Sequence, residues 1–188
     1  MSLNYLISID EAKKYLYKTD VPTGANVFVE QRLEMYRSSA HRAICNKVGF
    51  EILSTVYTDE RHKGNDYHDV YLDNRPITLL TAVKYNDVEK TLGDYEVIDS
   101  KYLHYEDGYF TESSYWWKFS YTAGYTSTTM PGDIKLTAVE LIKLYHDASN
   151  RKAGTSSESD GATGNSISFD PDAEKNILKR LDSYVKQC

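Results

Sequence analysis

The chain has 188 residues, of which 40% are hydrophobic and 27% are charged, as expected for one soluble globular domain or a domain with an insertion. Its formal net charge of −6 argues against a protein that binds nucleic acid regardless of sequence, because such binding needs a basic surface. No apolar run approaches the roughly 18 residues of a membrane span, and the first residues lack a signal-peptide core. The sequence therefore predicts a soluble protein that is not exported by that route.

The residue types that stand out are tyrosine and cysteine. The 17 tyrosines combine apolar area with a polar tip, which suits protein interfaces, although β propensity alone explains them equally well. The two cysteines, Cys45 and Cys188, show neither metal-binding nor redox spacing. They indicate free thiols in a protein made in a reducing cytoplasm.

The first part of the sequence has the pattern of two helices. Ser8 and Glu11 form a capping box that predicts a helix over 9–17. A longer helix is predicted over 25–48, with a stop at Gly49. Its apolar stripe comprises Val29, Leu33, Tyr36, Ala40, Ile44 and Val48. The charged residues off this stripe, which indicate a solvated or subunit-facing side, are Arg32, Glu34, Arg37 and Arg42.

Between 50 and 129 the apolar period changes to two, which predicts an antiparallel β unit of about five to seven short strands. The first strand is predicted from Phe50 to Val56, and Asp107-Gly108 is predicted as a hairpin turn. The last strand, 116–122, is expected to bury alternate aromatic residues and to leave Trp116 as a surface contact. The other residues that mark strands are Val70, Leu72, Leu79, Tyr85, Tyr95, Val97, Tyr102, Leu103 and Tyr105.

Two further helices follow the β unit. Pro131 and Asp133 start a helix predicted over 133–150, and the last helix is predicted over 171–187. Between them, 152–169 is rich in Gly and Ser and has few apolar residues, which predicts a flexible loop, either a passive linker or a segment ordered by a partner. The apolar positions of the first of these helices are Ile134, Ala138, Leu141, Ile142, Tyr145 and Ala148.

Together these patterns predict an α+β fold. A helical bundle of about four helices is expected from 1–49 and 130–188, with a small antiparallel β unit inserted at 50–129.

The sequence offers little catalytic chemistry. His62, Asp66, His68 and Asp69 are close in sequence and have side chains of the types that bind metals, but they surround a predicted turn, and solvated turn polarity is the simpler interpretation. Neither His41 nor His146 has an evident Ser, Cys or carboxylate partner for a triad, and no phosphate-binding loop is present. We therefore expect no catalytic, cofactor-binding or metal site.

A resemblance to a known family narrows the function. It rests on the order and spacing of 70–77 (VYLDNRPI), 80–85 (LTAVKY), 95–99 (YEVID), 119–125 (FSYTAGY), 130–135 (MPGDIK) and Leu144-Tyr145. In these segments, and across nearly the whole chain, the sequence resembles the head–tail connector (adaptor) proteins of long-tailed double-stranded DNA bacteriophages.

The resemblance implies a structural virion protein without enzyme activity or cofactor. It implies a homo-oligomeric ring, usually a dodecamer, that docks under the portal protein, extends the DNA channel and attaches the stopper or tail-completion protein. Double-stranded DNA would pass without specific binding, which suits a net-acidic chain. The implied location is the virion neck at the head–tail interface, reached after assembly in the host cytoplasm.

A ring of identical subunits needs two different patches on each subunit. The candidate interface residues are Trp116, Arg151, Ser157, Glu158, Ser159, Phe169 and Tyr184. Arg151 follows Asn150, where relatives often carry Arg-Glu, so no family contact is transferred to it. Two alternatives remain open: a carbohydrate- or protein-binding module that uses a Tyr/Trp-rich sheet, and a hydrolase with a metal at His62 and His68.

Overall fold

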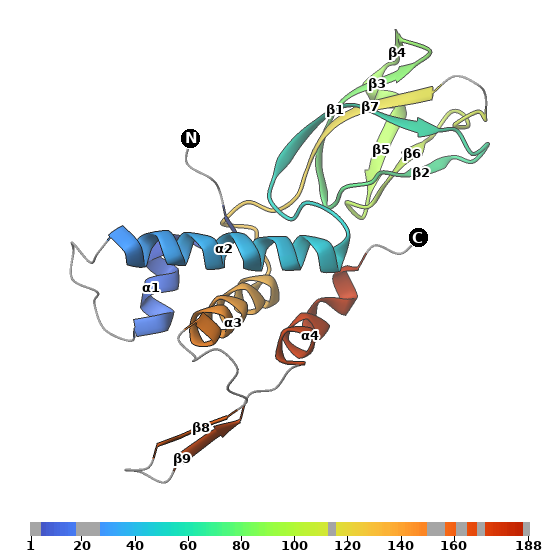
Figure 1. The fold of residues 1–188 in the computed structure, drawn as a ribbon. Helices are drawn as coiled ribbons and strands as arrows, with labels where there is room; N and C mark the ends of the chain where they lie inside the picture. Colours follow the sequence, from blue (N-terminus) through green and yellow to red (C-terminus); the bar gives the residue numbers. More distant parts are fainter. Residues whose placement is uncertain are drawn as a thin grey trace. The chain divides into compact units, whose positions relative to one another are not determined.

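The computed structural model describes residues 5–17, 27–112, 116–149, 157–160, 165–168 and 172–185. The chain divides into two compact units (Figure 1). The helical unit consists of Met1–Gly49 and Met130–Cys188, and the β unit is Phe50–Thr129. The described residues form four α-helices and antiparallel sheets of four and three strands, which confirms the predicted α+β class.

The four helices lie close to their predicted positions. They are α1 (Ile9–Tyr17), α2 (Val27–Val48), α3 (Gly132–Ser149) and α4 (Ala173–Leu178). The prediction of one helix over 171–187 is wrong in its second half, where the chain tightens into the 3₁₀ helix η2 (Lys179–Tyr184). Such tightening is common where an α-helix ends, and here it accompanies complete burial of Leu181.

Burial in the helical unit follows the predicted apolar stripes. On α2, Leu33 and Ile44 are fully buried, and on α3 the same holds for Ile134 and Leu141. Ala148 is exposed, contrary to its predicted core position. An exposed alanine at the end of α3 costs nothing, because Ala has the highest helix propensity of all residues.

The capping box predicted at the start of α1 is present. Ser8 Oγ accepts a hydrogen bond from the Glu11 N–H (3.1 Å), and the Glu11 carboxylate accepts one from the Ser8 N–H (2.7 Å). The backbone bond and then the hydroxyl of Ser8 lower the pKa of Glu11. The carboxylate is therefore held in its charged form at the positive end of the helix dipole.

Replacing Ser8 by Ala is expected to lower the free energy of unfolding by about 1 kcal/mol, because a backbone N–H of the first turn loses its acceptor. Urea titration followed by far-UV circular dichroism measures the loss. The control is Ser39→Ala at an exposed position within α2, where Ala is the better helix former. Equal losses in the two variants would show that the cap does not stabilise α1.

Arg37 corrects the prediction that the charged residues of α2 all face solvent or another subunit. Its side chain is only 10% exposed, and its Nη1 pairs with Glu34 (2.6 Å). Its Nε and Nη2 donate to the carbonyl oxygen of Ile7 at 3.0 and 2.8 Å. Its guanidinium also lies 4.6 Å from the centre of the Tyr5 ring. Arg37 thus fastens the segment before α1 onto α2.

The β unit contains two antiparallel sheets. Their strands are β1 (Thr55–Lys63), β2 (Asp69–Tyr71), β3 (Ile77–Tyr85), β4 (Val88–Glu89), β5 (Tyr95–Ile98), β6 (Tyr102–Tyr105) and β7 (Trp116–Ala123). The four-stranded sheet has the order β1-β7-β3-β4, and the three-stranded sheet has the order β2-β6-β5. A short 3₁₀ helix, η1 (Leu92–Asp94), precedes β5.

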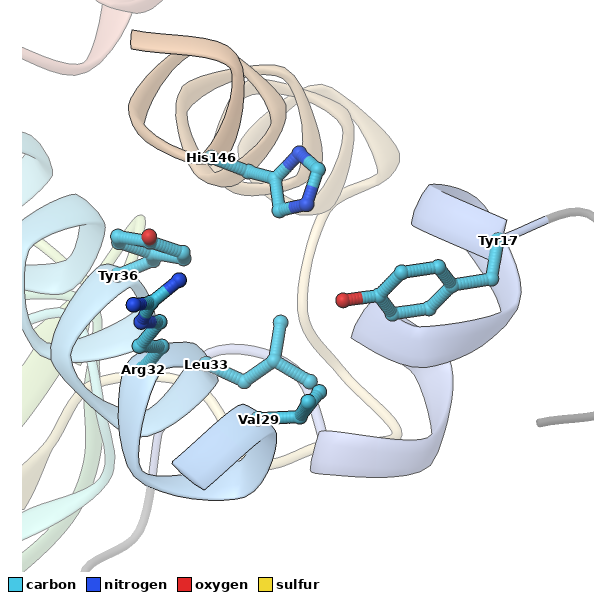
Figure 2. A pocket seen from close by; sticks show the side chains of 6 residues that line it. All are labelled: Tyr17, Val29, Arg32, Leu33, Tyr36 and His146. Carbon is cyan, nitrogen blue, oxygen red and sulfur yellow. The ribbon is translucent and has the colours of Figure 1, made fainter. Parts of the chain in front are cut away.

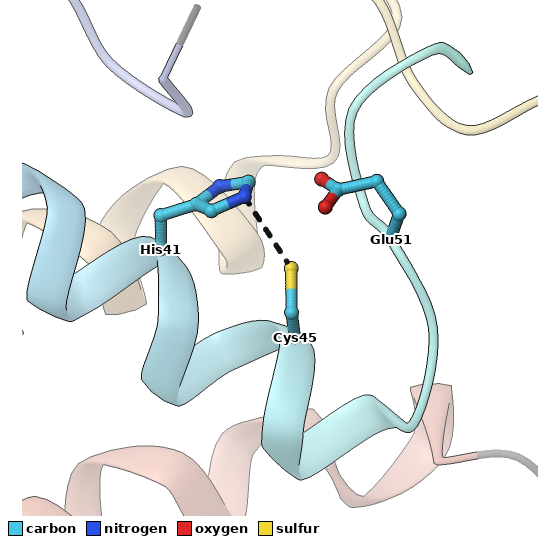
Figure 3. A group of neighbouring side chains, drawn as sticks. All are labelled: His41, Cys45 and Glu51. Carbon is cyan, nitrogen blue, oxygen red and sulfur yellow. Dashed lines mark hydrogen bonds between the residues drawn. The ribbon is translucent and has the colours of Figure 1, made fainter. Parts of the chain in front are cut away.

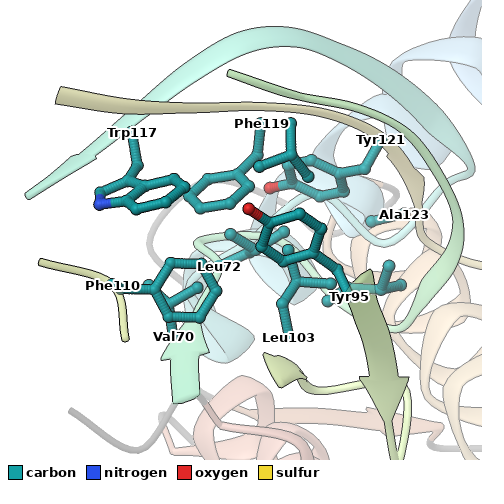
Figure 4. Packing of buried hydrophobic residues seen from close by; sticks show 11 residues of the cluster. Val70, Leu72, Tyr95, Leu103, Phe110, Trp117, Phe119, Tyr121 and Ala123 are labelled. Atoms are coloured by element: carbon teal, nitrogen blue, oxygen red, sulfur yellow. The ribbon is translucent and has the colours of Figure 1, made fainter. Parts of the chain in front are cut away.

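Strand β7 supplies the centre of the β-unit core, as the alternation in the sequence predicts. Trp117, Phe119 and Tyr121 are buried on one face of the strand. They pack with residues of the three-stranded sheet, including Val70 and Leu103 (Figure 4). The two sheets therefore share one core between their inner faces.

The chain leaves β7 at Gly124, whose φ of 102° lies in the left-handed region. A Cβ at this position would lie 2.5 Å from the Leu53 carbonyl oxygen, so both the backbone angle and the space require glycine.

Two predictions within the β unit are wrong. The first strand does not run from Phe50 to Val56: β1 starts at Thr55, Ile52 is fully buried, and Val56 is 68% exposed. Pairing with β7 determines which side chains of β1 face the core, and the register of this pairing is irregular between Tyr57 and Glu60. Asp107-Gly108 forms no hairpin, because β6 pairs with β2 and β5 whereas the following strand, β7, belongs to the other sheet.

The segment predicted as a Gly/Ser-rich loop, 152–169, contains strands β8 (Ser157–Asp160) and β9 (Asn165–Ser168). They pair antiparallel with each other. Their sequences, SESD and NSIS, have few residues of high β propensity, which explains why the sequence pattern predicts no strand here.

Candidate functional site

The predicted interface residues lie in both units. In the β unit, Trp116 is the first residue of β7, pairs with Lys63 of β1 and is 47% exposed. In the helical unit, Tyr184 ends η2 and is half-buried; burial, and then the charge of Asp133, raises its pKa. Residues 157–159 lie on β8, namely Ser157, Glu158 and Ser159. Arg151 and Phe169 lie outside the described residues.

The side chains considered as metal ligands from the sequence do not form one centre within the part of the chain that the structure describes. Each has a separate partner, and no ligand atom is shared among the four. His62 Nε2 contacts the Glu60 carboxylate (2.6 Å), and the Asp66 carboxylate accepts a hydrogen bond from the Glu112 N–H (2.6 Å). His68 Nδ1 contacts the Tyr105 carbonyl oxygen (3.1 Å), and the Asp69 carboxylate contacts His104 Nδ1 (2.6 Å). The interpretation as polar residues around a turn therefore holds better than a shared metal site.

Sequence reasoning missed Glu60, which is the centre of a polar network on the inner face of β1. Its side chain is 16% exposed, in a strand face that is otherwise packed on aromatic residues. One carboxylate oxygen contacts His62 Nε2 (2.6 Å) and accepts from the Asp73 N–H (3.3 Å). The other accepts from the hydroxyl of Tyr121 (2.7 Å) and the amide of Asn74 (3.1 Å).

This network ties β1 and β7 to the turn that leads into β3. Burial by itself would raise the pKa of Glu60, but the bonds from His62, Tyr121 and the Asp73 backbone outweigh it, and the pKa is lowered. Burial also raises the pKa of Tyr121, so its hydroxyl stays protonated and donates. The clamp also contains a group of side chains close enough to hold a metal ion, since one ligand atom each of Glu60, His62 and Asp73 lies within 4.8 Å of the others. The oxygens of Glu60, however, already take part in four hydrogen bonds. The arrangement acts as a structural clamp.

We expect Glu60→Gln to lower the stability of the β unit by about 1–3 kcal/mol at pH 7, because the clamp loses its charge-assisted bonds. The pKa of Glu60 is lower in the folded protein than its ordinary value of 4.5, which applies to the unfolded chain. Its charged form therefore stabilises the fold above pH 4.5, and this contribution is lost as the pH falls through the pKa of the folded state. The difference between variant and parent should therefore shrink below about pH 4.5.

Urea unfolding followed by tryptophan fluorescence between pH 3 and 7 checks this expectation. The control is Glu96→Gln, an exposed carboxyl on β5, which should follow the parent at each pH. A Glu60→Gln difference that stays constant across this range would mean that the charge of Glu60 does not stabilise the clamp.

The helical unit contains a small pocket between α1, α2 and α3 (Figure 2). Val29 and Leu33 form its apolar side, while the rings of Tyr17 and Tyr36 each lie edge-on to His146, at 5.9 and 6.2 Å. Its remaining lining residue is Arg32, an exposed cation. Its volume of about 120 Å³ is well below the roughly 300 Å³ at which small-molecule sites begin. The pocket fits one side chain better than a cofactor.

His41 does have a cysteine neighbour, which corrects the expectation from the sequence. Its Nε2 lies 3.7 Å from the sulfur of Cys45, one turn further along α2 (Figure 3). The signal was present in the sequence as an i, i+4 spacing, which puts two side chains on one face of a helix. The third residue drawn, Glu51, belongs to the β unit, where its carboxylate accepts from the Leu53 N–H (3.1 Å). His146 likewise has a carboxylate neighbour, Asp147 (3.1 Å).

Among the described helices, none is both long and apolar enough to span a membrane. Exposed aromatic side chains, such as Trp116 (47% exposed) and Tyr71 (60% exposed), are a feature suited to contacts between proteins.

Three solved structures of gene transfer agent (GTA) particles contain a chain with a similar fold. The chain aligns over its full length with 97% of a chain in the neck of an empty gene transfer agent (GTA) particle computed with C6 symmetry, at a TM-score of 0.62 and 15% identity. A chain in the virion of a native GTA particle matches with a TM-score of 0.61 and 14% identity, and the alignment covers 96% of this chain and 94% of that chain. A chain in the neck of a native GTA particle computed with C12 symmetry matches with a TM-score of 0.54 and 12% identity, and the alignment covers 100% of this chain and 97% of that chain.

No curated protein matches the chain. A family model, in contrast, described as "Head completion protein", matches residues 5–186. This match confirms the resemblance to head–tail connector proteins and the expectation of a structural protein rather than an enzyme. The chain belongs to the head completion protein family.

Proposed function

We propose that this protein is a structural component of a virion neck, a head–tail adaptor that docks as a ring under the portal protein. In this role it extends the DNA channel and gives the stopper or the tail its attachment surface. The observation that carries the proposal is the family match over residues 5–186. The fold it shares with chains of GTA particles supports the same role.

The solved neck structures also support the proposed ring. The related neck structures were computed with C6 and C12 symmetry, which fits several copies around one axis. A dodecamer is the ring size we propose, with DNA passing through without specific binding. Such a ring needs a heterologous interface, in which each subunit contributes two different patches.

We propose that both units take part in assembly. The helical core of 1–49 and 130–188 and the inserted unit of 50–129 each have packed apolar residues of their own, which supports treating them as two compact units. The contact residues proposed from the sequence are Trp116, Arg151, Ser157, Glu158, Ser159, Phe169 and Tyr184. Within 152–169, the β8–β9 pair would contact a neighbouring subunit or line the channel. Hydrogen exchange measured on the free protein and on assembled particles tests this. The amides of this segment should exchange more slowly in the particles.

The test of the function compares free protein with assembled particles. Light scattering should find the isolated protein monomeric or weakly associated, since the sequence has no coiled-coil heptads and we propose that the ring forms on the portal protein as a template. Mixed with its portal protein, it should form a complex whose electron micrographs show a ring at the narrow end of the portal.

Deleting the protein from the producing cell gives the second readout. Particles with filled heads and unattached tails are expected. Normal tailed particles in its absence, or a free protein that binds portal-less tails alone, would overturn the adaptor assignment. A stable closed ring formed without portal would overturn only the templated assembly.

A further inference from the structure

We propose that His68 and His104 of the β unit bind one divalent transition-metal ion of the zinc type through their Nε2 atoms. His68 lies in the turn before β2, and His104 lies on β6. Their rings are inclined by only 28°, with centres 5.7 Å apart. We name this pair the two-histidine site. It differs from the group of four side chains considered from the sequence, because His104 comes from a distant strand.

The hydrogen bonds of the two rings determine which nitrogen atoms remain for a ligand. His104 Nδ1 lies 2.6 Å from a carboxylate oxygen of Asp69, and His68 Nδ1 lies 3.1 Å from the carbonyl oxygen of Tyr105. Carboxylate and carbonyl oxygens only accept hydrogen bonds, so Nδ1 is the donor in both rings. A neutral imidazole with its proton on Nδ1 has a lone pair on Nε2. Both rings therefore offer Nε2 as a ligand atom.

The same two hydrogen bonds are of the kind that orients histidine ligands in metal sites. A histidine that binds a metal usually donates its other ring N–H to a carboxylate or to a backbone carbonyl, which fixes the ring and makes the ligating nitrogen more basic. In the two-histidine site, one ring has a carboxylate as its partner and the other has a carbonyl. Within the described residues, neither Nε2 takes part in a hydrogen bond. Asp69 is thus a positioning residue for His104.

The backbone holds both histidines in place before any ion binds. The register of β2 and β6 sets Asp69 opposite His104, which brings the carboxylate to the ring that it orients. The carbonyl oxygen of His68 accepts a hydrogen bond from the Tyr105 N–H (2.8 Å), so His68 is bound to Tyr105 through both its backbone and its ring. The Tyr109 ring packs against His68 with centres 4.2 Å apart. Such support is what a preformed ligand site requires.

The spacing of the two rings fits one shared ion. With zinc–nitrogen distances of about 2.0–2.1 Å, two imidazoles on the same ion have ring centres roughly 5–6 Å apart. The observed distance of 5.7 Å lies in this range. Both side chains are half-buried, so water can reach the ion and complete its coordination.

The chemistry of the ligands selects the class of ion. Imidazole nitrogen suits zinc, copper and nickel, whereas Mg²⁺ and Ca²⁺ prefer oxygen ligands. Two carboxylates add negative charge beside the rings: Asp69, and the exposed Glu96 opposite His104 on β5. A bound ion would fasten the turn before β2 to β6 and so stabilise the three-stranded sheet.

Zinc titration of the metal-free, full-length chain tests the two-histidine site. NMR spectra that correlate imidazole protons with their ring nitrogens report on the five histidines of the chain. The Nε2 signals of His68 and His104 should shift together and stop changing at one equivalent of Zn²⁺, whereas Mg²⁺ should shift neither. Shifts confined to the other histidines, or no saturable shift, would overturn the proposal.

Substitutions separate the ligands from the residue that positions them. Asp69→Asn should lower the zinc affinity measured by calorimetry about 10–100-fold, as is usual when the partner of a histidine ligand loses its charge. His68 and His104 should still shift together in this variant, at higher zinc concentrations. His104→Gln removes a ligand, so it should lower the affinity at least as much and abolish the joint shift. Tryptophan fluorescence confirms that each variant is folded.

The matched control is Asp73→Asn. It removes an exposed carboxylate from the other group of β-unit side chains close enough to hold a metal, which also contains Glu60 and His62. Zinc affinity and the joint shift should be unchanged. Loss of zinc binding in this variant but not in His104→Gln would place the ion in the clamp and overturn the proposal.

The two-histidine site goes beyond the proposed function and does not depend on it. Zinc binding is measured on the isolated chain, whereas the adaptor role is tested with portal protein and particles. If zinc fails to bind, the proposal of the two-histidine site is wrong and the adaptor role stands. If the protein is absent from the neck, the proposed function fails and the zinc measurements keep their meaning.

Discussion

Replacing Phe119 by Ala is expected to lower the free energy of unfolding of the β unit by about 3–5 kcal/mol. Phe119 is fully buried at the centre of β7. Its ring lies parallel to Trp117 with centres 6.4 Å apart, and edge-on to Phe110 at 5.9 Å and to His62 at 5.6 Å. Removing the ring leaves a cavity between the two sheets, which neighbours held by strand pairing cannot fill.

Urea unfolding followed by tryptophan fluorescence measures this loss, because both tryptophans of the chain, Trp116 and Trp117, are in β7. Leu79→Ala is the control, since it truncates an apolar side chain that is exposed on the neighbouring strand β3. It should change stability by less than about 0.5 kcal/mol. Similar losses for the two variants would show that Phe119 is not in a packed core.

In the helical unit, Leu141→Ala is expected to cost about 2–5 kcal/mol. Leu141 is fully buried on α3, on the same stripe as Ile134 and Ala138. The substitution removes a branched side chain at the contact of α3 with its neighbours and leaves a cavity there. The loss is measured by far-UV circular dichroism during urea titration, which reports mainly on the helices.

The matched control for this variant is Leu136→Ala, on the same helix but exposed. Both substitutions remove the same atoms and introduce the same helix propensity, so their difference isolates burial. A loss below about half a kcal/mol for Leu141→Ala would contradict the placement of α3 in the core.

The features that depend on local pattern could be predicted from the amino-acid sequence alone. Helix α3 and strand β7 were predictable because apolar residues recur at the helical period in one and at every second position in the other. The cap at Ser8 was predictable because both of its hydrogen bonds join residues three positions apart. The order and spacing of short segments, rather than any reactive residue, gave the family resemblance that the match over 5–186 confirms.

The features that depend on pairing between distant segments could be found only once the strands were placed in three dimensions. The start of β1 at Thr55 and its irregular register are set by β7, more than 50 residues further along the chain. That register turns Glu60 inward, to meet a tyrosine 61 positions away, and turns Arg61 outward beside Lys118. A shift of one residue along β1 would reverse both orientations, and no local pattern in 55–63 determines which one the strand adopts. The clamp around Glu60 therefore became visible only when the strands were paired.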